Sequence, residues 1–165
     1  MQPILLKITA FLFVFISATA HSQSKNEKQE MMEKLLNSRE FVFIADRAIP
    51  QGERSIILSS SSNFLKVHPK KIEANLPFFG RAYSGMPYGG EYGIQFNAEP
   101  SDYRLTKDKN NYEINATVKG EYDFYKINLN IGADGSATLN IYPIKKSYIS
   151  YYGTIQPAEK NEEDD

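Results

Sequence analysis

Residues Tyr112–Ile141, YEINATVKGEYDFYKINLNIGADGSATLNI, decide the fold class, because apolar and polar side chains alternate along most of their length. Two turn signals, Lys119-Gly120 and Asp134-Gly135, divide this stretch into three runs. Strict alternation is typical of a strand with one buried face, and Asp-Gly between two such runs indicates a tight hairpin. The stretch therefore predicts three antiparallel strands in succession.

Weaker strand patterns extend the same architecture in both directions along the chain. They lie at Phe41–Ala48, Arg54–Ser60, Phe64–His68, Lys71–Leu76, Gly93–Asn97, Asp102–Lys107 and Ser147–Ile155. The gaps between them are too short for the crossovers of about a dozen residues that parallel pairing needs. Closure would protect the edges of so large a sheet. We therefore expect a mainly β fold, an antiparallel up-and-down barrel of the lipocalin-like kind, with a β-sandwich as the alternative.

The N-terminus has the pattern of a signal peptide. Lys7 provides a positive charge, Ile8–Ile16 is an apolar core of nine residues, and Ala18-Thr19-Ala20 offers small residues for cleavage. The core is too short to span a bilayer, and no Cys follows it for lipid attachment. We expect residues 1–20 to be removed and the protein to be exported to the periplasm or the cell exterior, neither membrane-spanning nor a lipoprotein.

The remaining chain divides into three segments. Residues 21–39 contain a short amphipathic helix, Ser24–Ser38, whose apolar face we expect to dock on the domain through the Met31, Met32, Leu35 and Leu36 side chains. Residues 40–157 form a single β domain. Residues 158–165 are acidic, and we expect a disordered tail there.

Composition excludes several classes of function. The net charge of −1 and the lack of a basic cluster give no electrostatic footprint for nucleic acid. Zero Cys and two His cannot supply the usual zinc ligands or a Ser-His or Cys-His pair. The sequence therefore predicts no catalytic residue, no metal and no cofactor.

The stretch Leu76–Phe96, LPFFGRAYSGMPYGGEYGIQF, is the candidate binding site. A loop of this length is uncommon in a compact domain unless it is functional or disordered, and its aromatic content argues against disorder. Arg81 could stack on aromatic rings while its guanidinium binds a carboxylate or phosphate, or it could tie the loop to backbone carbonyls. The predicted ligand-binding residues are Phe79, Arg81, Tyr83, Tyr88 and Tyr92.

Three blocks carry a resemblance to a known family: Phe41–Leu58 (FVFIADRAIPQGERSIIL), Leu76–Phe96, and Ser147–Ile155 (SYISYYGTI). Together they resemble the family called domain of unknown function 4251, small secreted proteins of Bacteroidetes-type bacteria. The resemblance implies an exported β domain and no assigned activity.

Three functions remain open. The first is non-enzymatic binding of a small apolar or amphipathic ligand under the 76–96 loop. The second is an envelope structural or interaction protein that binds a protein or glycan partner. Its exposed tyrosines would be Tyr88, Tyr92, Tyr148 and Tyr152. The third is a hydrolase that uses Glu91, Glu99 and Asp102. We expect binding rather than catalysis; the sequence identifies neither the ligand nor the oligomeric state.

Overall fold

The computed structural model of the chain describes residues 27–83 and 93–158. The predicted signal peptide, Glu91, the binding candidates Tyr88 and Tyr92, and tail residues 159–165 lie outside the described residues.

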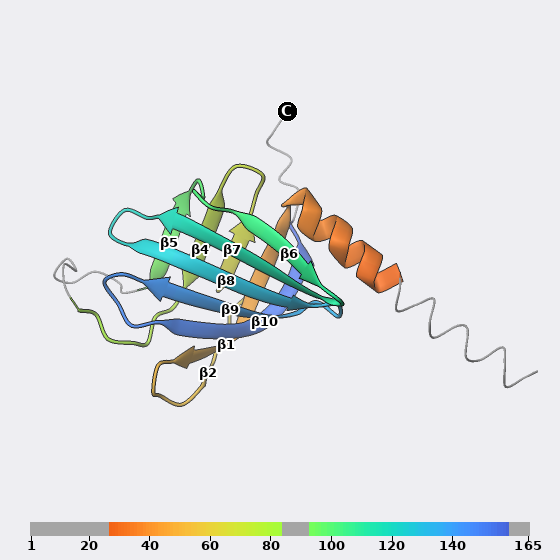
Figure 1. Cartoon of the computed structure of the whole chain (residues 1–165). Coiled ribbons are helices and arrows are strands. Elements are labelled where there is room, and N and C mark those ends of the chain that lie inside the picture. Colours follow the sequence, from red (N-terminus) through yellow and green to blue (C-terminus); the bar gives the residue numbers. More distant parts are fainter. Residues whose placement is uncertain (1–26, 84–92, 159–165) are drawn as a thin grey trace, which may run out of the picture.

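Ten strands form a single antiparallel sheet (Figure 1). They are β1 (Phe41–Pro50), β2 (Ile56–Ile57), β3 (Phe64–Val67), β4 (Ile72–Leu76), β5 (Ile94–Ala98), β6 (Arg104–Asp108), β7 (Asn111–Lys119), β8 (Phe124–Gly132), β9 (Ser136–Pro143) and β10 (Ile149–Pro157). The order across the sheet is β5-β4-β3-β1-β10-β9-β8-β7-β6, with β2 paired to β1. The first strand thus pairs with the last. Of the other neighbours along this path, β3 and β1 are separated in sequence by the short strand β2, and the rest are consecutive.

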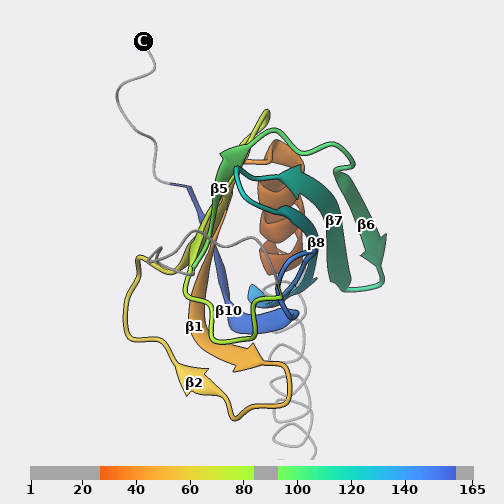
Figure 2. The ribbon, with the colours of Figure 1, turned by 90° about the vertical axis from the view of Figure 1, so that its left-hand side faces the viewer.

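The sheet curls into a half-barrel (Figure 2). Its two edges are β5 and β6, and the chain between them crosses the opening, where Pro100 forms an isolated bridge with Val118. The predicted mainly β, antiparallel, up-and-down fold with one N-terminal helix is confirmed. In the described part of the chain, β5 and β6 do not pair, so hydrogen bonds do not close the ring.

The hairpin predicted from Asp134-Gly135 joins β8 to β9. Its turn begins at Gly132, whose carbonyl accepts a hydrogen bond from the Gly135 amide over 3.0 Å. Gly135 has φ 85°, a left-handed conformation that glycine adopts without a steric cost. The connection is a three-residue loop with a left-handed glycine, which is one of the common hairpin geometries.

The concave side of the sheet holds the core. Most strands contribute side chains that are almost completely buried, among them Tyr151, Phe41, Phe43, Leu65, Ile114, Leu129 and Leu139. The alternation in the sequence produces this arrangement, because every second residue of a strand points to the same face. The polar half of the pattern lies on the outer side.

The N-terminal helix, residues 27–38, packs against the core cluster (Figure 2). Leu36 is completely buried, and Met32 and Leu35 pack against the cluster. Lys107 of β6 forms an ion pair with Glu33 over 2.6 Å. The expected docking by Met31 is wrong: this side chain is 62% exposed. Met32, Leu35 and Leu36 are related by the i, i+3, i+4 spacing of one helix face, and Met31 lies beside that face.

Candidate functional site

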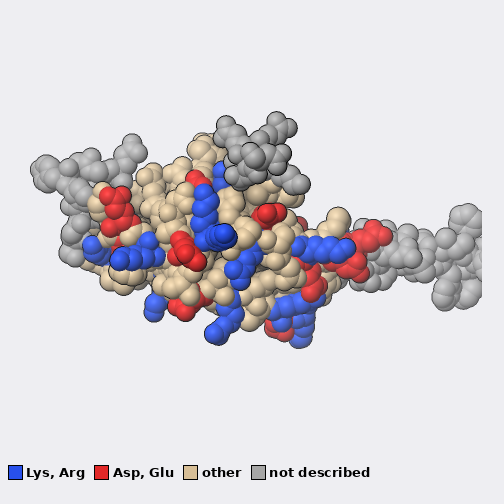
Figure 3. All heavy atoms as spheres, turned by 90° about the horizontal axis from the view of Figure 1, so that it is seen from above, with Lys and Arg blue, Asp and Glu red and all other residues tan. Residues whose placement is uncertain are grey.

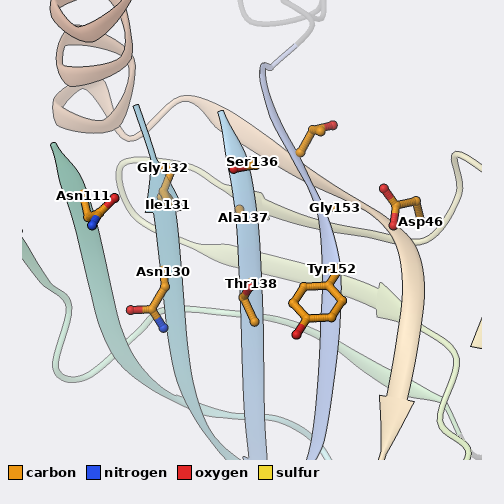
Figure 4. Close-up of a pocket in the computed structure, with 11 residues that line it drawn as sticks. Asp46, Asn111, Asn130, Ile131, Gly132, Ser136, Ala137, Thr138, Tyr152 and Gly153 are labelled. Carbon is orange, nitrogen blue, oxygen red and sulfur yellow. The ribbon is translucent and has the colours of Figure 1, made fainter. Parts of the chain in front are cut away.

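A groove of about 660 Å³ lies on the outer side of the sheet, across β10, β9 and β8 (Figure 4). Its lining residues are Asp46, Asn111, Asn130, Ile131, Gly132, Ser136, Ala137, Thr138, Tyr152, Gly153 and Thr154. Asn130, Thr138 and Tyr152 are cross-strand neighbours, since Tyr152 pairs with Thr138 and Thr138 pairs with Asn130. Their side chains therefore project from three adjacent strands on the same face.

A β-bulge in β1 places Asp46 at one side of the groove. The pairing of β1 with β10 shifts by one residue between Ala45 and Arg47, so Asp46 is the extra residue. The amide of Leu58 donates a hydrogen bond to the Asp46 carbonyl over 2.8 Å and ties the bulge to the neighbouring segment. Bulges redirect side chains and occur often next to functional sites. The Asp46 carboxylate is consequently exposed beside Gly153.

Tyr152 provides the aromatic surface of the groove. Its side chain is 45% exposed, and Figure 4 shows the ring over β10 and β9 beside Thr138. Within the part of the chain that the structure describes, neither the Tyr152 phenol nor the Thr138 hydroxyl forms a hydrogen bond. A phenol ring offers an apolar face together with a polar tip. A ligand can therefore pack on the Tyr152 ring and also form a hydrogen bond with its phenol.

An asparagine network borders the groove and has a structural role. The Asn128 amide nitrogen donates to Glu113 and Asn115, over 2.6 and 2.9 Å, and its oxygen accepts from Asn130 and Asn140. These four bonds use the whole hydrogen-bonding capacity of one carboxamide. One N–H of the Asn130 side chain donates to Asn128. Its amide oxygen and its second N–H are available at the groove.

The β8–β9 turn fixes one end of the groove. Ser136 donates to the Asp134 carboxylate through both its hydroxyl, over 2.6 Å, and its backbone amide, over 3.1 Å. These hydrogen bonds lower the pKa of Asp134 below its usual value. Asp134 stays ionised and holds the turn. Among the described residues that line the groove, Asp46 contributes the one carboxylate, and the other polar groups are uncharged.

The predicted loop residues lie at a different place, beyond the end of β4. Phe79, Arg81 and Tyr83 are all exposed. In the described residues, the Arg81 guanidinium contacts neither a ring nor a carboxylate. The Arg81 backbone instead pairs with Ser147: its carbonyl accepts from the Ser147 amide over 2.8 Å, and its amide donates to the Ser147 hydroxyl over 3.0 Å. The main chain, rather than the guanidinium, anchors this part of the loop.

Both described ends of the loop are tied to β10 and the segment before it. The Tyr151 phenol donates to the Pro77 carbonyl over 2.7 Å, and the Lys146 ammonium donates to the Gly93 carbonyl over 2.9 Å. Burial lowers the pKa of Lys146. A second hollow, of about 380 Å³, lies here. Its lining residues are Asn63, Asn75, Leu76, Pro77, Phe78, Gly93 and Gln95.

The sequence profile of the family described as Domain of unknown function (DUF4251) matches residues 23–155. The chain belongs to this family. A crystal structure of a DUF4251 family protein from Bacteroides eggerthii DSM 20697 is similar, with a TM-score of 0.61 and 19% sequence identity, covering 79% of this chain and 87% of that chain. A likeness at this identity shows a shared fold alone. A search of the curated proteins found no match.

Two of the three predicted hydrolase carboxylates lie in the described part of this DUF4251 protein. Glu99 and Asp102 lie in the connection between β5 and β6, and Glu91 lies outside the described residues.

Across residues 27–83 and 93–158, no three acidic or histidine side chains are placed to hold a metal ion, and no helix is long and apolar enough to cross a membrane. Acidic and basic side chains are interspersed on the face seen in Figure 3.

Of the groove residues, sequence reasoning identified Tyr152 as a possible surface residue and missed the others. A signal was present, because the outward positions of the central strands include Asn111, Asn128, Asn130 and Asn140. Asparagine is depleted in strands, so its repeated occurrence on one face of the sheet indicates that these side chains have a specific role. The bulge at Asp46 could not be predicted, because the alternation of side chains in β1 does not show which residue is left unpaired.

Proposed function

We propose that this DUF4251 protein is an exported, non-enzymatic binding domain whose outer groove holds a neutral saccharide unit. The observation that carries this proposal is the exposed Tyr152 ring beside uncharged hydroxyl and amide groups. The Thr138 hydroxyl and the Tyr152 phenol have no hydrogen-bond partner among the described residues. A pocket that combines an apolar surface with a few convergent polar groups is the usual form of a small-molecule site.

The chemistry of a sugar matches these groups. One face of a pyranose ring is lined by C–H groups and can pack on the Tyr152 ring, while its hydroxyls both donate and accept hydrogen bonds. Asn130 and Thr138 can satisfy hydroxyls of either kind. The exposed Asp46 carboxylate can accept hydrogen bonds from sugar hydroxyls and would repel an anionic sugar. A neutral saccharide therefore fits better than a uronic acid.

The same groups favour binding over hydrolysis. Glycoside hydrolysis generally uses two carboxyl groups on opposite sides of the scissile bond. Within residues 27–83 and 93–158, Asp46 is the one carboxylate that lines the groove, and hydrogen bonds from Ser136 hold the nearby Asp134 in the ionised form. Export, as expected from residues 1–20, would place the domain where extracellular glycans occur.

Affinity electrophoresis in native gels tests this proposal. Gels containing starch, xylan or galactomannan should include at least one that retards the protein, whereas polygalacturonate should not. Tyr152→Ala should abolish the retardation. Tyr122→Ala, which removes an exposed tyrosine from the β7–β8 turn, should leave it unchanged. Equal migration of the wild type and Tyr152→Ala in every gel would contradict the proposal.

A second candidate is binding of a small apolar or amphipathic ligand under the 76–96 loop. The hollow at the loop base supports it, because Pro77 and Phe78 provide an apolar wall. The exposed Phe79 follows Phe78 directly in the chain. The probe is the fluorescent dye anilinonaphthalene sulfonate. This candidate expects Phe79→Ala to reduce the dye's fluorescence and Ile57→Ala, an exposed apolar side chain on β2, to leave it unchanged. An equal loss in both variants would indicate nonspecific adsorption.

A further inference from the structure

A second aromatic surface lies on the same face of the sheet as the groove. The rings of Tyr142 and Tyr148 stack with centroids 5.8 Å apart and planes 26° from parallel. Their side chains are 45% and 41% exposed, respectively. Stacked pairs hold each other in place. The pair therefore presents an ordered apolar surface to solvent.

The strand register aligns this pair with the groove. In the β9–β10 ladder Ser150 pairs with Asn140 and Tyr152 pairs with Thr138. Tyr148 lies two residues before Ser150, beside Tyr142. At about 3.4 Å per residue, the Cα atoms of Tyr148 and Tyr152 are about 14 Å apart along the strand direction. The two aromatic surfaces thus follow one another along the direction of β10, on its outer face.

The positions between the two aromatic surfaces are polar. The Ser150 hydroxyl donates to the Asn140 amide oxygen over 2.6 Å, and the Asn140 nitrogen donates to Asn128 over 3.1 Å. One N–H of Asn140 remains available. Along β9 and β10, the outward side chains are therefore aromatic at the Tyr142–Tyr148 pair, polar at Ser150 and Asn140, and aromatic again at Tyr152. This is the pattern that a chain of linked sugar rings, each with an apolar face and a hydroxyl rim, would match.

We infer that the ligand of the groove is a glycan chain of several units that runs along β9 and β10, with the Tyr142–Tyr148 pair as its second platform. This inference rests on the proposed saccharide site at Tyr152 and adds the substrate class to it. Ile144, which is 68% exposed just beyond the pair, would belong to a general apolar patch that a protein partner could cover. A glycan has no need of that aliphatic side chain.

Isothermal titration with xylo-oligosaccharides and manno-oligosaccharides, from disaccharide to hexasaccharide, tests the inference. For the wild type, affinity should rise with chain length in one series. Tyr148→Ala should remove the gain for the hexasaccharide, about three- to tenfold, and leave disaccharide affinity unchanged. Tyr148→Phe, which keeps the ring, should retain the gain. Tyr152→Ala should abolish binding at every length.

The outcomes separate the inference from the proposal beneath it. If Tyr152→Ala abolishes binding but Tyr148→Ala has wild-type affinity for the hexasaccharide, the second platform is wrong and the single-unit site stands. If the wild type binds no oligosaccharide of either series and no polysaccharide gel retards it, the saccharide site itself is wrong. If Ile144→Ala weakens hexasaccharide binding as much as Tyr148→Ala does, the surface is a general apolar patch and the glycan platform is contradicted.

Discussion

Gly153 of β10 lies directly against the backbone carbonyl of Ile44 in β1, and a Cβ at position 153 would overlap that oxygen. This close approach sits opposite the bulge at Ala45–Arg47, where Gly153 pairs with Ala45. Glycine in a strand interior often marks a bulge or a close approach of two backbones. The contact fixes the separation of β1 from β10, and therefore the position of Asp46 relative to Tyr152.

Replacing Gly153 with alanine should destabilise the protein and distort the groove. The added methyl group meets backbone atoms, which cannot rotate away, so we expect a loss of about 1–3 kcal/mol or more. Thr154→Ala, an exposed change at the next residue, should cost less than about 0.5 kcal/mol. Urea unfolding measures both. Equal midpoints for Gly153→Ala and the wild type would show that the strands can separate without cost.

The hydrogen bond from Tyr151 to Pro77 should stabilise the start of the 76–96 loop. Tyr151→Phe removes the donor and leaves the Pro77 carbonyl without this partner, which should cost about 1 kcal/mol. It should also speed proteolytic cleavage within residues 76–96. Tyr152→Phe is the matched control, because the Tyr152 phenol has no hydrogen bond within the described residues. If both variants are cleaved at the wild-type rate, the bond does not anchor the loop.

Stability should fall in alkaline solution. Burial raises the pKa of Tyr125 to about 12, and burial also raises the pKa of Tyr151. Unfolded tyrosine ionises near pH 10. Between these values the unfolded chain has lost protons that the folded protein keeps, so the free energy of unfolding decreases as pH rises. Tyr125→Phe should flatten this decrease between about pH 10 and pH 12. A slope that is unchanged in Tyr125→Phe would argue against the raised pKa.

The helix should stabilise the half-barrel through Leu36. Leu36→Ala removes a completely buried side chain and should cost about 2–5 kcal/mol. Met31→Ala, on the exposed side of the same helix, should be close to neutral. Thermal unfolding of the two variants gives the comparison. If they lose the same small amount, the helix does not pack on the core in solution.

Alternation of side chains predicted most of the fold, because each strand buries one face and solvates the other. The pattern of Ile127, Leu129 and Ile131 against Asn128 and Asn130 specifies both the strand and its orientation. Every predicted strand is present. The pattern does not report how far the sheet curls. The curl depends on strand twist and on the volume of the core, including the helix. The sequence therefore could not predict that the edges β5 and β6 stay unpaired.

The candidate site was less predictable. Tyr152 could be placed on a surface from its spacing, but its neighbours Asp46 and Asn130 come from strands remote in sequence. Their proximity depends on a bulge and on strand register. Sequence reasoning instead favoured the loop around Arg81, because a long aromatic segment is conspicuous in a linear reading. In the described residues, the backbone of that segment pairs with Ser147.

Nuclear magnetic resonance titration tests the central claim most directly. We would titrate ¹⁵N-labelled protein with the neutral oligosaccharide that binds and record backbone amide shifts. The account predicts the largest shifts at Asp46, Tyr152, Gly153 and Thr154, with little change at Phe79–Tyr83. Saturable shifts confined to Phe79–Tyr83, with the groove amides unmoved, would contradict it.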